Sequence, residues 1–73
     1  MSQQSAVDSF PLYTQVDVLV GLPQDRIFYR AYGEVIGVDR HTRTVKISKV
    51  FAKSDSVGVG IGSVVTVRIH CLH

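Results

Sequence analysis

Three glycines at every second position constrain this chain more than any other feature. Residues 57–62 read Val-Gly-Val-Gly-Ile-Gly. Side chains in a β-strand alternate between the two faces of a sheet, so the three glycines would share one face. Glycine weakens a strand, and a row of three favours sharp bending or the close approach of another backbone. In a chain of 73 residues this pattern predicts a tightly curled small β-barrel.

The chain is long enough for one small domain. A domain of this length buries only about 60% of its unfolded surface, so its stability is marginal without further support. Cys71 is the single cysteine and cannot form an internal disulfide. The hydrophobic content of 45% therefore predicts that apolar surface is buried against other copies of the same chain.

Cysteine usage and hydropathy also indicate the compartment. One unpaired cysteine favours a reducing environment, and residues 1–9 lack the basic and apolar regions of a signal peptide. No apolar run approaches the ~20 residues that span a bilayer. We expect a cytoplasmic protein with no membrane partner.

Period-two alternation predicts five short strands, at residues 15–22, 27–38, 44–51, 57–61 and 63–71. Gly33 and Gly37 interrupt the second strand and permit bulges that bend it. In the third strand, alternation places Val50 on the outward face. Either a bulge near Lys49 corrects this, or Val50 faces a partner subunit. The predicted fold class is all-β: a small, strongly bent, five-stranded open barrel.

The predicted domain organisation is simple. Residues 1–14 form an N-terminal tail or short cap, and residues 15–73 form a single barrel domain. Residues 10–13, Phe-Pro-Leu-Tyr, carry apolar bulk that suits the open end of a barrel. A short helical turn is compatible with this segment.

The order of these elements resembles the Sm and Sm-like (LSm) family of small, SH3-like barrels. Residues 16–20, Val-Asp-Val-Leu-Val, resemble the V-x-V-x-L opening of the first Sm motif. Residues 26–39 are similar to its long bent strand, which ends at an aspartate, here Asp39, and residues 44–47 follow as the third strand. Residues 61–65 resemble the start of the second motif.

Two motif elements differ from the family pattern. After its aspartate the family's turn carries a hydrophobic residue and an asparagine, whereas residues 40–43 here read Arg-His-Thr-Arg. The Arg-Gly pair of the second motif is replaced by Val-Arg-Ile at residues 67–69. These differences bear on uridine-specific RNA binding more than on the fold.

The resemblance implies a ring. Sm subunits pair strand edges to close a cyclic homo-oligomer of roughly five to eight copies, and an open barrel has edges that invite such pairing. Positive charge is concentrated in residues 23–53, where seven basic residues face three acidic ones. This excess of four charges favours an anionic partner. The alternative is that these bases only keep strand faces soluble.

The candidate nucleic-acid-binding residues are Arg40, His41, Arg43 and Arg68. The first three share one predicted turn. There arginines would neutralise phosphates, and the imidazole of His41 would stack on a base near the pore of the ring. The alternative is an ordinary exposed turn with solubilising charge.

The aromatic run at residues 28–32 has two interpretations. Aromatic residues interleaved with a basic residue suit a stacking platform for single-stranded nucleic acid. The favoured interpretation is packing, with Tyr29 in the core and with Phe28 and Tyr32 at a subunit contact.

No pattern predicts catalysis, a cofactor or a metal. His70, Cys71 and His73 are possible ligands, but neighbouring strand side chains point apart, so Cys71 is interpreted as a small buried hydrophobe. His41 could reach a serine in the fold, but no local signature supports a nucleophile–base pair, and the sequence has neither a dinucleotide fingerprint nor a P-loop.

The sequence therefore predicts an oligomeric, non-enzymatic Sm-like protein that binds single-stranded RNA or a similar anionic polymer through basic loops near a ring pore. The alternative is a ring-forming scaffold or protein-interaction module without nucleic-acid binding. A third interpretation is a small-ligand barrel with an enzymatic or sensory role, which predicts one deep apolar pocket per subunit.

Overall fold

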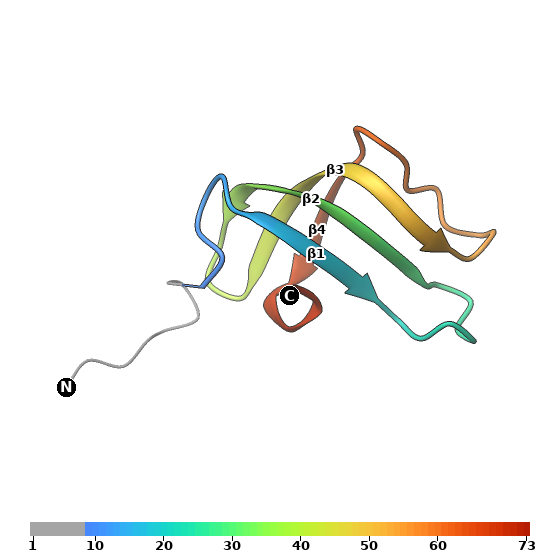
Figure 1. Cartoon of the computed structure of the whole chain (residues 1–73). Coiled ribbons are helices and arrows are strands. Elements are labelled where there is room, and N and C mark those ends of the chain that lie inside the picture. Colours follow the sequence, from blue (N-terminus) through green and yellow to red (C-terminus); the bar gives the residue numbers. More distant parts are fainter. Residues whose placement is uncertain (1–8) are drawn as a thin grey trace.

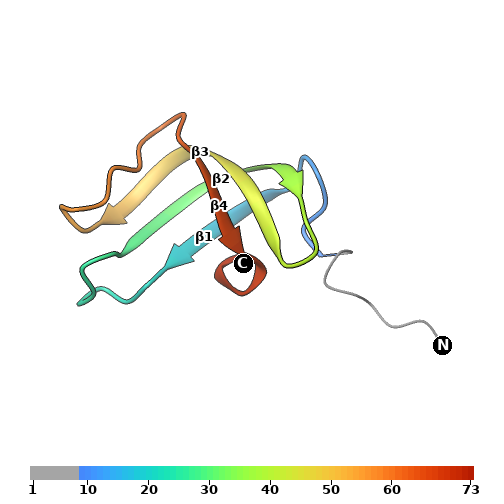
Figure 2. The ribbon, with the colours of Figure 1, turned by 180° about the vertical axis from the view of Figure 1, so that it is seen from behind.

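Four strands form one antiparallel sheet in the computed structural model, which describes residues 9–73. They are β1 (Gln15–Val20), β2 (Tyr29–Val38), β3 (Thr42–Lys53) and β4 (Val64–Arg68), and they lie in sequence order. A 3₁₀ turn, η2 (Ile69–Cys71), follows β4. Figure 1 shows an open, gently arched sheet with η2 beneath it, and Figure 2 shows the same arch from behind. No helix in residues 9–73 is long and apolar enough to cross a membrane.

The predicted strongly bent, five-stranded barrel was wrong in two respects: the sheet is open and not strongly curled (Figure 1), and residues 57–62 do not form a strand. This segment belongs to the connection between β3 and β4, not to a strand. Gly62 has a φ of 90°, which no strand residue adopts, and the N–H of Ser63 donates to the carbonyl of Gly60 at 3.0 Å. A Cβ added at Gly58 or Gly60 would meet no atom within 4 Å, so no backbone approaches these glycines closely. The last strand also ends earlier than predicted, at Arg68.

The inner face of the sheet carries the core, as the alternation predicted. Its fully buried side chains include Val16, Val18, Val35, Val45 and Ile47. Burying side chains of this size stabilises the fold by about 1.5–3 kcal/mol each. Successive residues between them point to the opposite face, which we call the outer face.

A predicted glycine bulge in β2 is confirmed at Gly37. The register between β2 and β3 shifts between Val35 and Gly37, which leaves Ile36 as the extra residue of β2. A bulge adds one unpaired residue and increases the local twist, so β2 can arch over the core without leaving β1 or β3.

The predicted bulge near Lys49 in β3 is confirmed as well. Lys49 pairs with Tyr32 and Ile47 with Gly33, so Ser48 is the extra residue. The shift returns Val50 to the inner face, where it packs against the core. Val50 is therefore not left for a partner subunit.

The C-terminal residues return to β1. Leu72 bridges to Val18, and Asp17 and His73 exchange backbone hydrogen bonds of 3.1 and 2.9 Å. Leu72 is buried in the core. The free edge of β1 is thus partly covered by the chain itself.

The edge of β4 is less protected. Among the described residues β4 pairs only with β3, and none of its five residues is buried. Val65 and Val67 face the core yet remain half-buried, while Val64 is 57% exposed. A short edge strand of branched residues is a template on which another chain can pair.

Residues 9–14 lie against the same end of the sheet as the β2–β3 turn. The N–H of Tyr13 donates to the carbonyl of Val35 at 2.7 Å, and Phe10 packs against the core. The segment forms a turn, closed by Thr14 N–H on the carbonyl of Pro11, where a helical turn was allowed for. The remainder of the predicted N-terminal tail, residues 1–8, lies outside the described residues.

Alkaline pH is expected to destabilise the fold through Tyr29. Burial, and secondarily the charge of Cys71, raise the pKa of the Tyr29 phenol above 10.0. Stability is then fully present below pH 10.0 and is lost as the pH rises through the folded pKa, because only the unfolded chain ionises freely. Urea midpoints measured at increasing pH should fall more steeply for the wild type than for Tyr29→Phe. Tyr13→Phe, at an exposed tyrosine, is the control and should follow the wild type.

Candidate nucleic-acid interface

The outer face is organised in rows that cross the strands. Tyr32 of β2 pairs with Asp17 of β1 and with Lys49 of β3. Opposite residues on one face of an antiparallel sheet have Cβ atoms about 5 Å apart. Each such row is therefore a set of neighbouring side chains from three strands.

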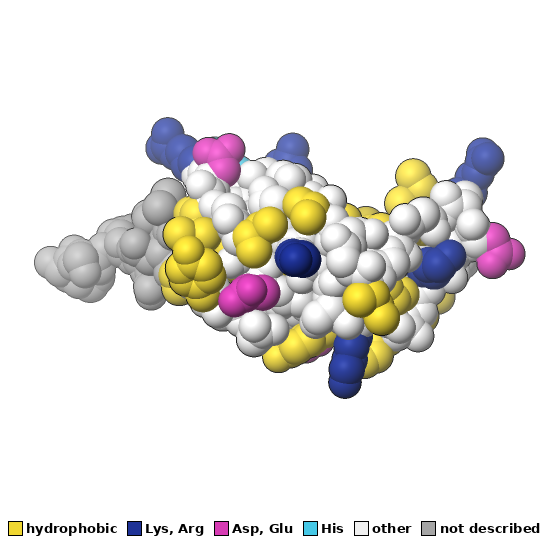
Figure 3. All heavy atoms as spheres, turned by 90° about the horizontal axis from the view of Figure 1, so that it is seen from above, with side chains coloured by type: hydrophobic (Ala, Val, Ile, Leu, Met, Phe, Trp, Pro, Cys, Tyr) yellow, Lys and Arg dark blue, Asp and Glu magenta, His cyan; other side chains and the backbone are white. Residues whose placement is uncertain are grey.

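Basic side chains run along this face from one end to the other. Lys46 and Lys49 are exposed on β3. Arg68 is exposed on β4, two residues from Thr66, whose hydroxyl lies 3.1 Å from that of Thr44 on the outer face. Figure 3 shows dark blue basic side chains among yellow hydrophobic ones across this surface. With Arg30 of β2, these basic side chains outnumber the two acidic ones on the outer face, Asp17 and Glu34, and we call them the positive track.

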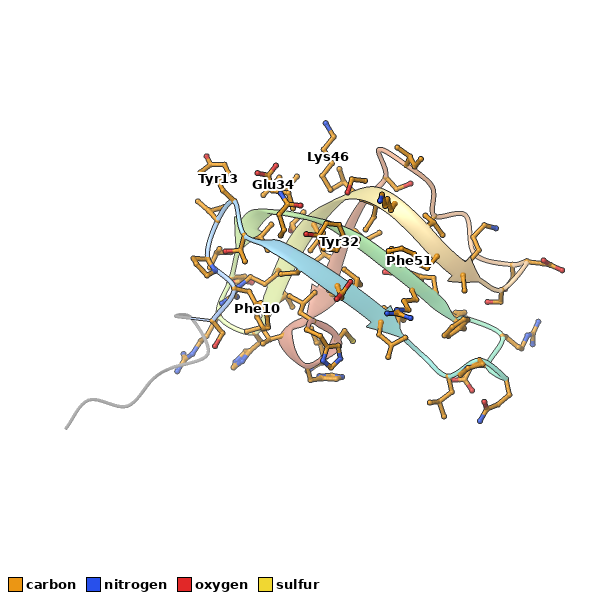
Figure 4. The ribbon with its side chains drawn as sticks, viewed as in Figure 1. Phe10, Tyr13, Tyr32, Glu34, Lys46 and Phe51 are labelled. Carbon is orange, nitrogen blue, oxygen red and sulfur yellow. The ribbon has the colours of Figure 1, made fainter. Side chains whose placement is uncertain are left out.

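Two aromatic rings accompany these bases. The guanidinium of Arg30 lies 5.4 Å from the centroid of the Phe51 ring, and Phe51 is 54% exposed. Tyr32 is half-buried two residues along β2. Figure 4 shows Tyr32 and Phe51 along the arch, with Glu34 and Lys46 projecting from its outer side. Exposed rings beside cations are the components of a base-stacking surface.

The turn between β2 and β3 brings three of the four predicted residues together. Arg40 and His41 are exposed in the turn, and Arg68 is close by because it pairs with Thr42. The carboxylate of Asp39 accepts the Arg40 backbone N–H at 2.7 Å, which shapes the turn. The turn thus extends the positive track at one end of the sheet, and its role in binding stays a prediction.

Arg43, the fourth predicted residue, occupies a different place. It is 0% exposed, and its guanidinium donates to the carbonyls of Ser9, Phe10, Asp39 and Thr42. A side chain so placed ties the N-terminal segment to the turn and presents no surface to a ligand. We therefore leave Arg43 out of the candidate interface.

Two hollows open near the outer face. The larger, of ≈ 410 Å³, lies beside β1 and is lined mainly by apolar side chains, among them Leu19, Leu22 and Phe28. The smaller, of ≈ 310 Å³, contains Gln15, Glu34 and Lys46. The larger hollow is mainly apolar, as the pocket of a small-ligand barrel would be. That a small ligand binds there stays a prediction.

The remaining predictions fall on the inner face and the C-terminus. Tyr29 is in the core, as the packing interpretation expected, whereas Tyr32 lies on the outer face. Residues 9–73 contain no group of three or more His, Cys, Asp or Glu that could hold a metal ion. His70 is exposed and Cys71 half-buried.

Sequence reasoning missed Lys49 and Phe51 as members of this interface. The signal was present in the alternation of β3, which places Lys46 on the face opposite to Val45 and Ile47. The Ser48 bulge then shifts the period by one and brings Lys49 onto the same face as Lys46.

Comparisons with family models, with curated proteins and with solved structures returned no significant match. No family is therefore identified, and the chain is described as a small all-β domain with a four-stranded antiparallel sheet.

Proposed function

We propose that this protein binds single-stranded RNA, or a chemically similar anionic polymer, across the outer face of its sheet. The observation that carries the proposal is that Arg30, Lys46, Lys49 and Arg68 share one face with two aromatic rings, the exposed Phe51 and the half-buried Tyr32. Cations along a strand attract phosphates, and rings stack on bases of any sequence. Arg40 and His41 continue the same track at the β2–β3 turn.

An open sheet face suits a single strand better than a duplex. Single-stranded binders spread successive bases over exposed rings, as sheet-based RNA-binding modules do. Phe51, held under Arg30, and Tyr32 are candidates for this contact. Each base stacked on an aromatic ring contributes about 1–3 kcal/mol.

Binding of this kind is expected to weaken steeply with salt. If about four phosphates are neutralised, log affinity against log salt has a slope of about −3, so affinity falls roughly 50-fold between 50 and 200 mM salt. Fluorescence anisotropy with labelled oligouridine and oligoadenine measures this. The double variant Lys49→Gln/Arg68→Gln should make the slope shallower by about 1.4.

Arg26→Gln is the matched control. Arg26 is an exposed base in the β1–β2 connection, outside the proposed track, so its replacement should change affinity less than about twofold. The proposal fails if neither oligonucleotide binds at 20 mM salt, or if the control weakens binding as much as the double variant.

The finer architecture that we propose is an Sm-like barrel that assembles into a ring. Two observations support it: the C-terminus returns to β1, and the edge of β4 lacks a partner among residues 9–73. A head-to-tail contact through that edge closes into a ring when the rotation between copies permits. Native mass spectrometry tests this, and a monomer at micromolar concentration would contradict it.

The second candidate function is a ring-forming scaffold or protein-interaction module without nucleic-acid binding. It is favoured by the apolar surface near β4, where Ile61 is 80% and Val64 57% exposed. A defined cyclic stoichiometry, together with no oligonucleotide bound at 20 mM salt, would identify the scaffold instead.

A further inference from the structure

The ≈ 310 Å³ hollow on the outer face contains a row of three different polar groups. Gln15 pairs with Glu34, and Glu34 pairs with Lys46, so an amide, a carboxylate and an ammonium group lie side by side on β1, β2 and β3. Ile61, which is 80% exposed, forms an apolar wall of the same hollow. The volume is at the small end of the range for ligand sites, about 300–1,000 Å³.

The charged groups of this row are not used within the fold. Across residues 9–73 no hydrogen bond or ion pair engages the carboxylate of Glu34 or the ammonium of Lys46, although they occupy paired positions. Opposite charges at paired positions commonly contact one another. Here both groups keep their hydrogen-bonding capacity for a ligand.

A carboxylate within a phosphate-binding track is unfavourable unless it binds something other than phosphate. Glu34 lies between Arg30 at one end of β2 and the basic turn at the other. A carboxylate only accepts hydrogen bonds, so its partner must donate. In single-stranded RNA the donors are the exposed edges of the bases and the 2′-hydroxyls.

We infer that this hollow selects guanine, an inference that rests on the proposed function. Guanine alone presents two adjacent N–H donors, N1–H and the N2 amino group, which match the two oxygens of one carboxylate. Beside them, O6 is an acceptor for the ammonium of Lys46. Adenine and cytosine offer one amino group next to an acceptor, and uracil one N–H between two carbonyls. Ile61 packs against the face of the base.

Anisotropy with labelled decamers tests this in a lithium buffer at 20 mM salt. The probes are alternating G-U, alternating A-U and alternating inosine-U. The G-U decamer should bind about 10-fold more tightly than the A-U decamer, because a bidentate base contact discriminates by about 1–3 kcal/mol. Inosine lacks the N2 amino group, so the inosine decamer should lose most of that preference without any change in the protein.

Glu34→Gln is the decisive variant. It keeps the size of the side chain but replaces one acceptor oxygen with a donor, so the G-U preference should fall to within about twofold. Asp17→Asn is the matched control: it removes the same charge from the outer face, one row away, and should keep the preference. Thermal melting checks that both variants remain folded.

The outcomes separate the two proposals. Equal binding of the G-U, A-U and inosine decamers by the wild type would overturn guanine selection and leave the proposed function standing. A preference retained by Glu34→Gln would assign the selection to other residues and overturn the role of this hollow. Failure of every decamer to bind would overturn the proposed function and guanine selection together.

Discussion

Replacing Arg43 with alanine is expected to lower the free energy of unfolding by about 3–5 kcal/mol, the range for truncating a large buried side chain. The guanidinium is fully buried and bonds four backbone carbonyls. Hydrogen bonds from a charged donor contribute about 1.5–3 kcal/mol each, and the truncated side chain also leaves a cavity. Because small domains are only marginally stable, most molecules of this variant should then be unfolded at 37 °C.

Urea denaturation, followed by circular dichroism, measures this loss. Arg40→Ala and Arg68→Ala are the controls: both remove an arginine from the same end of the sheet, but both residues are exposed. Their effect should stay within about 0.5 kcal/mol. Arg43→Lys should lose an intermediate amount, because an ammonium lacks the planar fork that reaches several carbonyls at once. A loss below about 1 kcal/mol in Arg43→Ala would contradict the structural role of this side chain.

The alternation of β3 indicated that Arg43 is buried, but this residue was predicted to lie in an exposed turn. Arg43, Val45 and Ile47 have the same parity, and all three are buried on the inner face. The strand was predicted to begin at Thr44, so Arg43 was assigned to a basic turn with Arg40 and His41. Observed β3 begins at Thr42. An arginine in phase with two core residues was the available signal for a buried, hydrogen-bonded guanidinium.

The core and the bulges could be predicted because they depend on local rules. Alternation gives Val16 and Val18 one common face, and the outward phase of Val50 indicated either a bulge near Lys49 or a contact with a partner subunit. The bulge is the alternative that the structure shows. Residues 57–62 could not be assigned in this way. A strand exists only where another strand satisfies its backbone groups, and no local pattern says whether such a partner is present.

The outer-face interface could be predicted only in part, because it depends on register. Lys46 and Tyr32 belong to different strands, and their common face follows from the pairing of β2 with β3. A one-residue slip would move every side chain of a strand to the other face. The Ser48 bulge has the same effect on the second half of β3: it changes the phase of the alternation after Ser48. Lys49 therefore lies on the outer face with Tyr32. The grouping of these side chains is a property of the sheet, not of any one segment.

Replacing Gly33 with alanine is expected to destabilise the fold more than any other glycine substitution within a strand. A Cβ at Gly33 would lie 2.2 Å from the carbonyl oxygen of Lys46 and 2.9 Å from a methyl group of Val45. The carbonyl belongs to the backbone of β3 and cannot rotate away as a side chain would. The sheet must separate locally at the bulge between Tyr32 and Gly33, so the loss should reach about 3 kcal/mol, the upper end of the range for overpacked cores.

Gly58→Ala is the matched control for this prediction. Gly58 is exposed, has no atom within 4 Å of an added Cβ and does not have a positive φ. Alanine there restricts mainly the unfolded chain, so stability should stay unchanged or rise by about 0.4–1 kcal/mol. Urea midpoints of the two variants therefore move in opposite directions if the glycines of β2 serve close strand packing and those of residues 57–62 do not. A loss in Gly58→Ala as large as in Gly33→Ala would mean that another backbone does lie against residues 57–62, as in a subunit contact of the proposed ring.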